Sequence, residues 1–212
     1  YPTDTIWGLG CDIFNEAAVD KIFKIKKRSK DKGFVLLVSD KEMLAQYVTR
    51  VHPRIDSLND FHKRPVTVIY NHPVNAWVAG FVGEPAMNFL TCDLQGNGDQ
   101  VHLSHKNFEI PLLSEQVKRL NGARKAKQAR MGVRPDALSI SMTDPGEPSI
   151  KGKIFVNELL GGDMLVEVEL EDARIRVKTT PEFNGKPGDS CHLTVNRDKW
   201  HVFDSGDGHA YF

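Results

Sequence analysis

The feature that most constrains this chain is a change of pattern near Tyr70. The residues before it alternate helical and strand-like stretches, which is typical of part of an α/β sheet. From about residue 87, short β-branched runs separated by turn-forming residues predict a small antiparallel barrel. The sequence therefore predicts an α+β chain made of two unlike pieces, and the first is too short to complete a sheet.

Composition excludes several classes of protein. Lys+Arg and Asp+Glu both number 28, so no net charge favours nucleic acid or an anionic membrane as a partner. No apolar run approaches the ~20 residues of a membrane-spanning helix, so we expect no direct membrane insertion. Cys11, Cys92 and Cys191 lie far apart and outside any CxxC spacing, and His102 and His105 lack further ligand-type neighbours. We therefore expect reduced thiols and no metal site.

The first piece contains helix signals and strand signals. Asn15 precedes an acidic first turn and a basic end, which predicts a capped helix up to Lys27. Asp40 caps a second helical stretch. The apolar runs Phe34–Val38 and Val66–Tyr70 are typical of buried strands.

The second piece opens with a short amphipathic helix predicted within residues 71–90. Gly161-Gly162 and the Gly-rich stretch at residues 96–98 are interpreted as hairpin turns. Leu113–Ala129 is a predicted helix with a basic linker. The predicted strands are Phe89–Leu94, Val101–Ser104, Arg130–Val133, Ile150–Leu160, Met164–Leu170, Arg174–Lys178, Cys191–Val195 and Trp200–Phe203.

The opening string, YPTDTIWGLGCD at residues 1–12, resembles the start of the threonylcarbamoyl-AMP synthase (YrdC-like) family. Lys26-Lys27-Arg28 matches that family's Lys-x-Arg after the first helix. Members condense threonine, bicarbonate and ATP for tRNA modification. The resemblance implies that Thr5 contacts threonine, and that Lys26 and Arg28 hold its carboxylate or the ATP phosphates.

The elements that complete such a nucleotide pocket should follow residue 70, and we do not find them in the sequence. Half a sheet with an open pocket cannot orient two substrates or exclude water. We therefore expect no catalytic residues and no cofactor. ATP would bind, and tRNA would be involved indirectly, only if the synthase interpretation holds.

The sequence from about Tyr70 resembles the C-terminal region of sugar ABC importer ATPase subunits of the maltose-importer class. Residues 70–90 match the segment before the regulatory domain, and Met131–Leu138 (MGVRPDAL) matches its G-[IV]-R-P-[ED] landmark. Leu159–Gly162 and Val202–Asp204 match a later turn and the terminal strand. In that family the region is a barrel of the oligonucleotide/oligosaccharide-binding (OB) type, called TOBE.

This second resemblance implies a regulatory domain that packs against its counterpart in an ATPase dimer. The candidate site is the motif Gly132, Arg134, Pro135 and Asp136, in which Arg134 either fixes a turn by hydrogen bonding or contacts an effector. The implied partners are ABC importer ATPase and permease subunits and a second copy through the barrel. The implied location is the cytoplasm, at the inner face of the membrane. No G-x-x-x-x-G-K-[ST] phosphate loop occurs in the sequence.

The predicted fold class is α+β: an incomplete α/β segment at residues 1–70, a linker helix at 71–86 and an antiparallel OB-like (TOBE) β-barrel at 87–212. The join cuts through the first fold, and we hypothesise a chimera of two fragments. Because Tyr1 lies within a motif, we also expect sequence before it.

Three functions remain open. The first is a non-catalytic regulatory module of a carbohydrate ABC importer. The second is a threonylcarbamoyl-AMP synthase whose missing pocket is supplied by the barrel or by another chain. The third is a sensor of a small ligand or sugar that uses the barrel alone.

Overall fold

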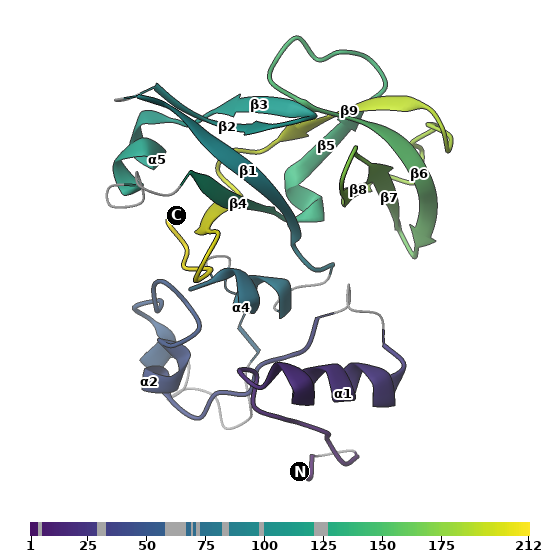
Figure 1. Ribbon diagram of the computed structural model, residues 1–212. Helices are drawn as coiled ribbons and strands as arrows, with labels where there is room; N and C mark the ends of the chain where they lie inside the picture. Colours follow the sequence, from purple (N-terminus) through teal and green to yellow (C-terminus); the bar gives the residue numbers. More distant parts are fainter. Residues whose placement is uncertain are drawn as a thin grey trace.

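The chain folds into a strand-rich part and a helical part, with a short helix between them (Figure 1). The computed structural model describes residues 1–3, 6–28, 33–57, 67–68, 70, 73–81, 85–97, 100–120 and 127–212.

The strand-rich part consists of two five-stranded antiparallel sheets, ordered β10-β4-β1-β2-β3 and β5-β9-β6-β7-β8. The predicted fold class is confirmed, with two open sheets where we expected one barrel. In the second sheet, β8 also lies close to β5, so this sheet curves towards closure. The strands are β1 (Asn88–Asn97), β2 (Gln100–His105), β3 (Phe108–Pro111), β4 (Gln128–Val133), β5 (Leu138–Ser141), β6 (Ile150–Leu160), β7 (Asp163–Glu169), β8 (Arg174–Thr179), β9 (Ser190–Val195) and β10 (Trp200–Asp204).

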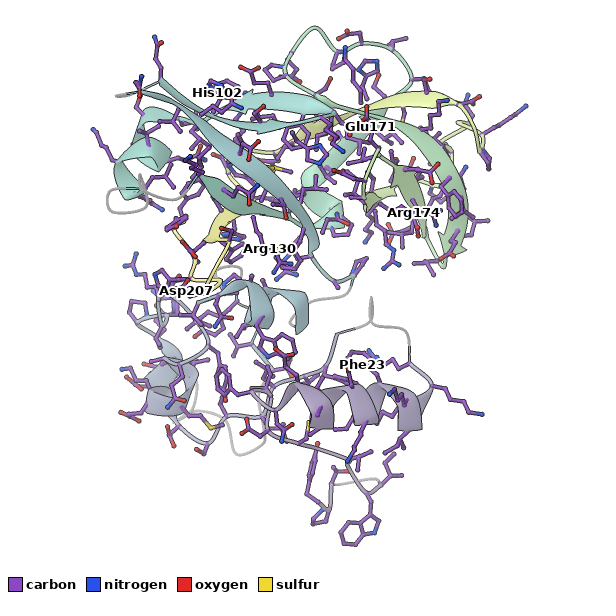
Figure 2. All side chains as sticks on the ribbon, viewed as in Figure 1. Phe23, His102, Arg130, Glu171, Arg174 and Asp207 are labelled. Atoms are coloured by element: carbon purple, nitrogen blue, oxygen red, sulfur yellow. The ribbon has the colours of Figure 1, made fainter. Side chains whose placement is uncertain are left out.

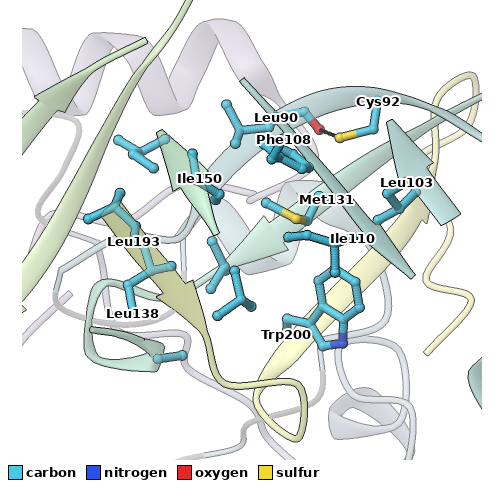
Figure 3. Packing of buried hydrophobic residues seen from close by; sticks show 14 of the residues in the cluster. Leu90, Cys92, Leu103, Phe108, Ile110, Met131, Leu138, Ile150, Leu193 and Trp200 are labelled. Atoms are coloured by element: carbon cyan, nitrogen blue, oxygen red, sulfur yellow. Dashed lines mark hydrogen bonds between the residues drawn. The ribbon is translucent and has the colours of Figure 1, made fainter. Parts of the chain in front are cut away.

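Both sheets share one hydrophobic core. Leu90 and Met131 from the first sheet and Ile150 and Leu193 from the second belong to the same buried cluster, shown in Figure 3. Burial alternates along β9, as expected for a strand with one face on a core. The C-terminal part therefore buries its apolar residues with its own strands.

The local turn predictions are confirmed. Gly161 has φ 63° between β6 and β7, and Gly96 has φ 111° at the end of β1, a conformation that L side chains rarely adopt. Every predicted strand after residue 87 is present. The sequence patterns missed β3 and β5, each of which has four residues.

The first two helices begin where their capping residues predict. Helix α1 (Glu16–Lys26) follows Asn15, whose side chain accepts a hydrogen bond from the Ala18 N–H. Helix α2 (Lys41–Leu44) follows Asp40, which accepts one from the Met43 N–H. After β3, helix α5 (Ser114–Arg119) begins the stretch predicted at Leu113–Ala129, and residues 121–126 lie outside the described residues.

The predicted strand Phe34–Val38 is wrong, because residues 33–38 form neither helix nor strand. Val35 and Leu37 are 73% and 63% exposed. A strand requires a neighbour that receives its backbone hydrogen bonds, and this segment has none among the described residues. Most of Val66–Tyr70, the other predicted strand, lies outside the described residues.

Helix α4 (Ala76–Phe81) joins the two parts and lies within the range 71–86 in which we expect a linker helix. On one side, Ala76 and Ala79 pack with Phe203 of β10. On the other, Trp77 and Val78 meet the helical part, where the Trp77 Nε1–H donates to the Ile13 carbonyl over 2.8 Å. Because α4 is apolar on both sides, each side needs a cover.

Candidate functional site

Two of the candidate synthase residues, Lys26 and Arg28, lie at the end of α1. Lys26 is exposed in its last turn, and Thr5 lies outside the described residues. The half-buried Arg28 donates from Nη2 to the Gly33 carbonyl over 2.8 Å, and its guanidinium lies 5.5 Å from the Phe34 ring centroid. Arg28 therefore contacts the segment that follows its own helix.

The opening motif folds back on itself. The amino group of Tyr1 donates to the Gly8 carbonyl over 2.9 Å, and Pro2 forms an isolated bridge with Trp7. The Tyr1 ring lies against Gly8, where any added Cβ would clash with it. Ile6 and Trp7 are 75% and 79% exposed, so these apolar side chains face solvent.

Gly132 of the G-V-R-P motif lies in β4, where side chains from β10 and from the residue before β1 pack closely against it. A Cβ on Gly132 would lie 2.5 Å from Cε2 of Phe203 and 2.7 Å from Sδ of Met87. Both of these side chains are buried. Only a glycine allows this close packing, so the first residue of the motif has a structural role.

The remaining motif residues form a short 3-10 turn, η2 (Pro135–Ala137). The Arg134 carbonyl accepts a hydrogen bond from the Ala137 N–H over 2.9 Å. Arg134 was predicted either to fix this turn by hydrogen bonding or to contact an effector, and its backbone carbonyl is the acceptor in the bond observed. Pro135 is buried, whereas Asp136 is exposed.

The Arg134 guanidinium is in an unusual environment. Its Nη1 is buried and has no hydrogen-bond partner among the described residues. Burial lowers the pKa of Arg134, and the charge of Asp136 opposes that shift. Nη1 therefore loses its hydration without gaining a hydrogen bond, which is unusual because buried polar groups are normally hydrogen-bonded.

Asn88 joins the two sheets and was not predicted. It is 9% exposed, its Nδ2 donates to the Arg176 carbonyl over 2.8 Å, and its Oδ1 accepts from the Arg176 N–H over 2.8 Å. These bonds cap the backbone of β8, the last strand of its sheet. No short-range sequence signal could reveal a partner 88 positions away.

The turn at residues 204–208 is hydrogen-bonded to the start of α4. The Asp204 carboxylate accepts hydrogen bonds from the Tyr211 hydroxyl and from the Gly206 and Asp207 N–H groups, and these bonds lower the pKa of Asp204. Figure 2 labels Asp207 in this turn, beside α4. The Gly208 carbonyl then accepts from the Ala76 N–H at the start of α4 over 2.9 Å.

An open groove of about 480 Å³ lies between the β2–β3 turn and the β5–β6 loop. His105 stacks on Phe108 beside it, with ring centroids 5.0 Å apart, and pairs with Asp172 over 3.1 Å. Within the described residues, no group of three or more side chains could hold a metal ion. The charged residues of the groove are Lys106, Glu109, Asp144, Glu147 and Lys151.

Sequence comparison also divides the chain in two, but the first match continues to residue 87, past the change of pattern near Tyr70. Residues 1–87 match the family described as Telomere recombination (Sua5, YciO and YrdC). Residues 83–138 match the MalK OB fold domain, and residues 131–203 match the TOBE domain. The chain resembles two different families, one on each side of residues 83–87. Both predicted resemblances are confirmed.

The relatives of the C-terminal part are ATP-binding proteins of ABC transporters. The multiple sugar-binding transport ATP-binding protein MsmK of Streptococcus mutans is 32% identical over 143 residues, which cover 65% of this chain and 37% of that protein. The maltose/maltodextrin import protein MalK of Vibrio cholerae is 29% identical over 67% of this chain and 37% of its own length. The uncharacterized ABC transporter ATP-binding protein YurJ of Bacillus subtilis is 31% identical over 68% and 40%.

The chain therefore spans about two fifths of the length of these relatives. Among solved structures, the cytoplasmic molybdate-binding protein ModG is similar with a TM-score of 0.42 and 13% identity, over 54% of this chain and 94% of that chain. No helix in the described ranges has both the length and the apolar character required to cross a membrane.

Proposed function

We propose that residues 87–212 are the C-terminal regulatory module of a carbohydrate ABC importer's ATP-binding subunit. The linker at residues 71–86 joins this module to a synthase-like segment at residues 1–70 that does not catalyse. The supporting observation is that the consecutive OB and TOBE matches, residues 83–203, coincide with two sheets around one core.

The module would act by association with importer ATPase and permease subunits, at the inner face of the membrane. Within its G-V-R-P-D motif, Gly132 and Pro135 are buried, and Asp136 is the exposed member. Asp136 is therefore the motif residue that a partner can reach. Gly132 would keep the surface in shape through its packing against Phe203.

The test is direct binding. The purified chain is titrated into a fluorescently labelled full-length ATP-binding subunit of a maltose-type importer, and anisotropy is measured. We expect saturable binding that weakens about tenfold with Asp136→Asn, the size of one charged contact. Asp198→Asn, at another exposed turn, is the matched control. Absence of binding to the subunit and to the assembled importer would refute the proposal.

A second candidate is the synthase, which the match over residues 1–87 favours. Against it, Arg28 contacts Gly33 and Phe34, and the side chains of Ile6 and Trp7 face solvent. We expect no release of pyrophosphate from ATP that depends on threonine and bicarbonate. Turnover that disappears in Lys26→Ala and in Arg28→Ala would reverse this assignment.

The third candidate, a small-ligand or sugar sensor, rests on the groove beside Lys106 and Lys151. It predicts saturable binding of maltose by the whole chain in calorimetry. Lys151→Ala should abolish that binding, and Lys186→Ala, at an exposed site outside the groove, should leave it unchanged. A flat titration with the wild type would exclude maltose as the ligand.

A further inference from the structure

The last five residues of the chain, called the tail below (residues 208–212), lie between β10 and the residues that lead into α4 (Figure 1). On one side the tail bonds to β10. The Tyr211 N–H donates to the Val202 carbonyl over 2.8 Å, and the Asp204 N–H donates to the His209 carbonyl over 2.8 Å. Because β10 is the edge strand of the first sheet, the tail continues that sheet by one more segment.

On its other side the tail bonds to the residues that lead into α4. The Ala76 N–H donates to the Gly208 carbonyl over 2.9 Å, and the Ala210 N–H donates to the Val74 carbonyl over 3.1 Å. The Val74 N–H in turn donates to the Tyr47 carbonyl of the helical part over 3.0 Å. One series of backbone hydrogen bonds therefore runs from the first sheet, through the tail, to the helical part.

The two sides of the tail differ in what holds them. At β10, the Tyr211 hydroxyl adds a hydrogen bond to the Asp204 carboxylate. Beside α4, the residues that the helix and the tail contribute to the buried cluster are alanines: Ala76, Ala79 and Ala210. Each alanine buries a single methyl group and therefore little apolar surface. The side that faces α4 is the weaker of the two.

We propose that the tail is a releasable clasp between the helical part and the sheets. It opens on the side of α4, so that residues 73–81 move away with the helical part while the tail stays on β10. The sheets remain folded, because Tyr211 and Phe212, which pack against their core, keep their places. The clasp lies beyond residue 203, where the TOBE match ends, so this role is additional to that of the matched domain.

Hydrogen exchange of the full chain, followed at single amides by NMR, tests where the clasp opens. Opening beside α4 frees the amides of Ala76 and Ala210, whereas those of Asp204 and Tyr211 stay bonded at β10. Relative to unfolded rates, we expect the first pair to exchange at least about tenfold faster than the second pair. Ala210 and Tyr211 give the sharpest contrast, since they are neighbours in the chain. Equal protection of these two amides overturns the proposal.

Gly208→Ala tests whether the tail controls this opening. Gly208 has φ 74°, and an added Cβ would lie 3.7 Å from the Cβ of Ala76, so the change strains the backbone without a clash. We expect exchange about tenfold faster at Ala76 and Ala210, and unchanged at Tyr211. Gly146→Ala is the matched control, because Gly146 has φ 71° in the β5–β6 loop and open space around an added Cβ. An equal effect of the two substitutions, or no effect at Ala76, overturns the proposal.

Tyr211→Phe weakens the opposite side of the clasp. It removes the hydroxyl bond to Asp204 and leaves the backbone bonds in place. We expect exchange about tenfold faster at Asp204 and at residue 211, with Ala76 unchanged. If Tyr211→Phe frees Ala76 as strongly as Gly208→Ala does, the tail leaves β10 as a whole, and the proposed direction of opening is wrong.

The amide of Val74 reports what moves. Its bond to Tyr47 lies inside the unit that leaves the sheets, so Gly208→Ala should leave its exchange rate unchanged. Faster exchange at Val74 would mean that the helical part unfolds where it should move away intact, and this result also overturns the clasp.

Discussion

The two parts of the molecule treat strand-forming sequence differently. Ile150–Leu160 is a strand because β7 and β9 flank it in the sheet. Residues 34–38 are as rich in apolar and β-branched residues, yet no strand forms there. A β-rich sequence therefore forms a strand only where a neighbouring strand receives its backbone hydrogen bonds.

Exposure gives the same contrast. The largest fully buried side chains, Phe203 and Leu90 among them, belong to the sheets or to the elements packed on them. Ile6, Trp7 and Leu37 in the helical part are more than 60% exposed. The sheets therefore carry the cooperative core, and the helical part adds to it mainly through α4.

Thiol reactivity should show the contrast most strongly. Cys11, in the helical part, is exposed, whereas Cys92 and Cys191 are buried in the sheets. Burial raises the pKa of Cys92 to about 12 and the pKa of Cys191 to about 11, which suppresses their reactive thiolates. With a disulfide reagent at pH 8, we expect Cys11 to react at least about a thousandfold faster than the other two.

Cys11→Ser is the control for that experiment, because it should remove the fast phase and leave the slow phase unchanged. Two or three fast thiols in the native protein would show that the sheets open readily. The sheets would then be no better protected from solvent than the helical part.

Limited proteolysis should cleave the helical part faster than the strand-rich part. The described residues up to 57 form short helices and have exposed apolar side chains. Residues 88–204, in contrast, contain the paired strands of both sheets and their common core. We expect sites in the first range to be cut about a hundredfold faster, as for a difference of ~3 kcal/mol in opening free energy. The fragments are identified by mass spectrometry. Earlier cleavage within β1–β10 would contradict this order.

Gly132→Ala tests how tightly the sheets are packed. The new Cβ would clash with Phe203 and Met87, so we expect a loss of about 2–3 kcal/mol in the free energy of unfolding. Urea denaturation followed by tryptophan fluorescence measures it. Gly162→Ala, where no atom lies within 4 Å, is the control and should change stability by less than ~0.5 kcal/mol. Equal effects at both positions would show that the core accommodates the methyl group.

Asn88→Ala tests the cap on β8. It removes two hydrogen bonds and leaves the N–H and C=O groups of Arg176 without those partners, so we expect a loss of about 1–2 kcal/mol. Thr91→Ser, at an exposed position of the same strand, is the control. If Asn88→Ala is neutral in urea denaturation, water replaces the cap and the edge of β8 is less protected than proposed.

Local features of this fold could be predicted from the sequence. Asn15 and Asp40 cap the helices that follow them, and Gly161 allows the positive φ of a tight hairpin, because each acts on its neighbours in the chain. Burial on one face similarly gives Ile150–Leu160 a recognisable pattern. The two family resemblances also follow from short ordered motifs.

Long-range features could not be predicted. The bonds between Asn88 and Arg176 depend on how two sheets meet, and no pattern near either residue encodes that. The strand expected at Phe34–Val38 requires a partner that is absent from the described residues. Of the candidate synthase residues, Arg28 lies against Phe34, a contact that its motif does not imply.

The smallest expected effect is on the free energy of unfolding when Arg134 is replaced. Because Nη1 is buried without a partner, Arg134→Met removes a desolvated charge and should change the unfolding free energy by only about 0–1 kcal/mol, towards stabilisation. Arg130→Met is the control, since the Arg130 guanidinium lies 4.7 Å from the Phe89 ring centroid and its loss should cost about 0.5–1 kcal/mol. Urea denaturation compares the two variants. A loss above ~2 kcal/mol for Arg134→Met would mean that the guanidinium has a partner in solution, and Arg134 would then stabilise η2 through its side chain as well as its backbone.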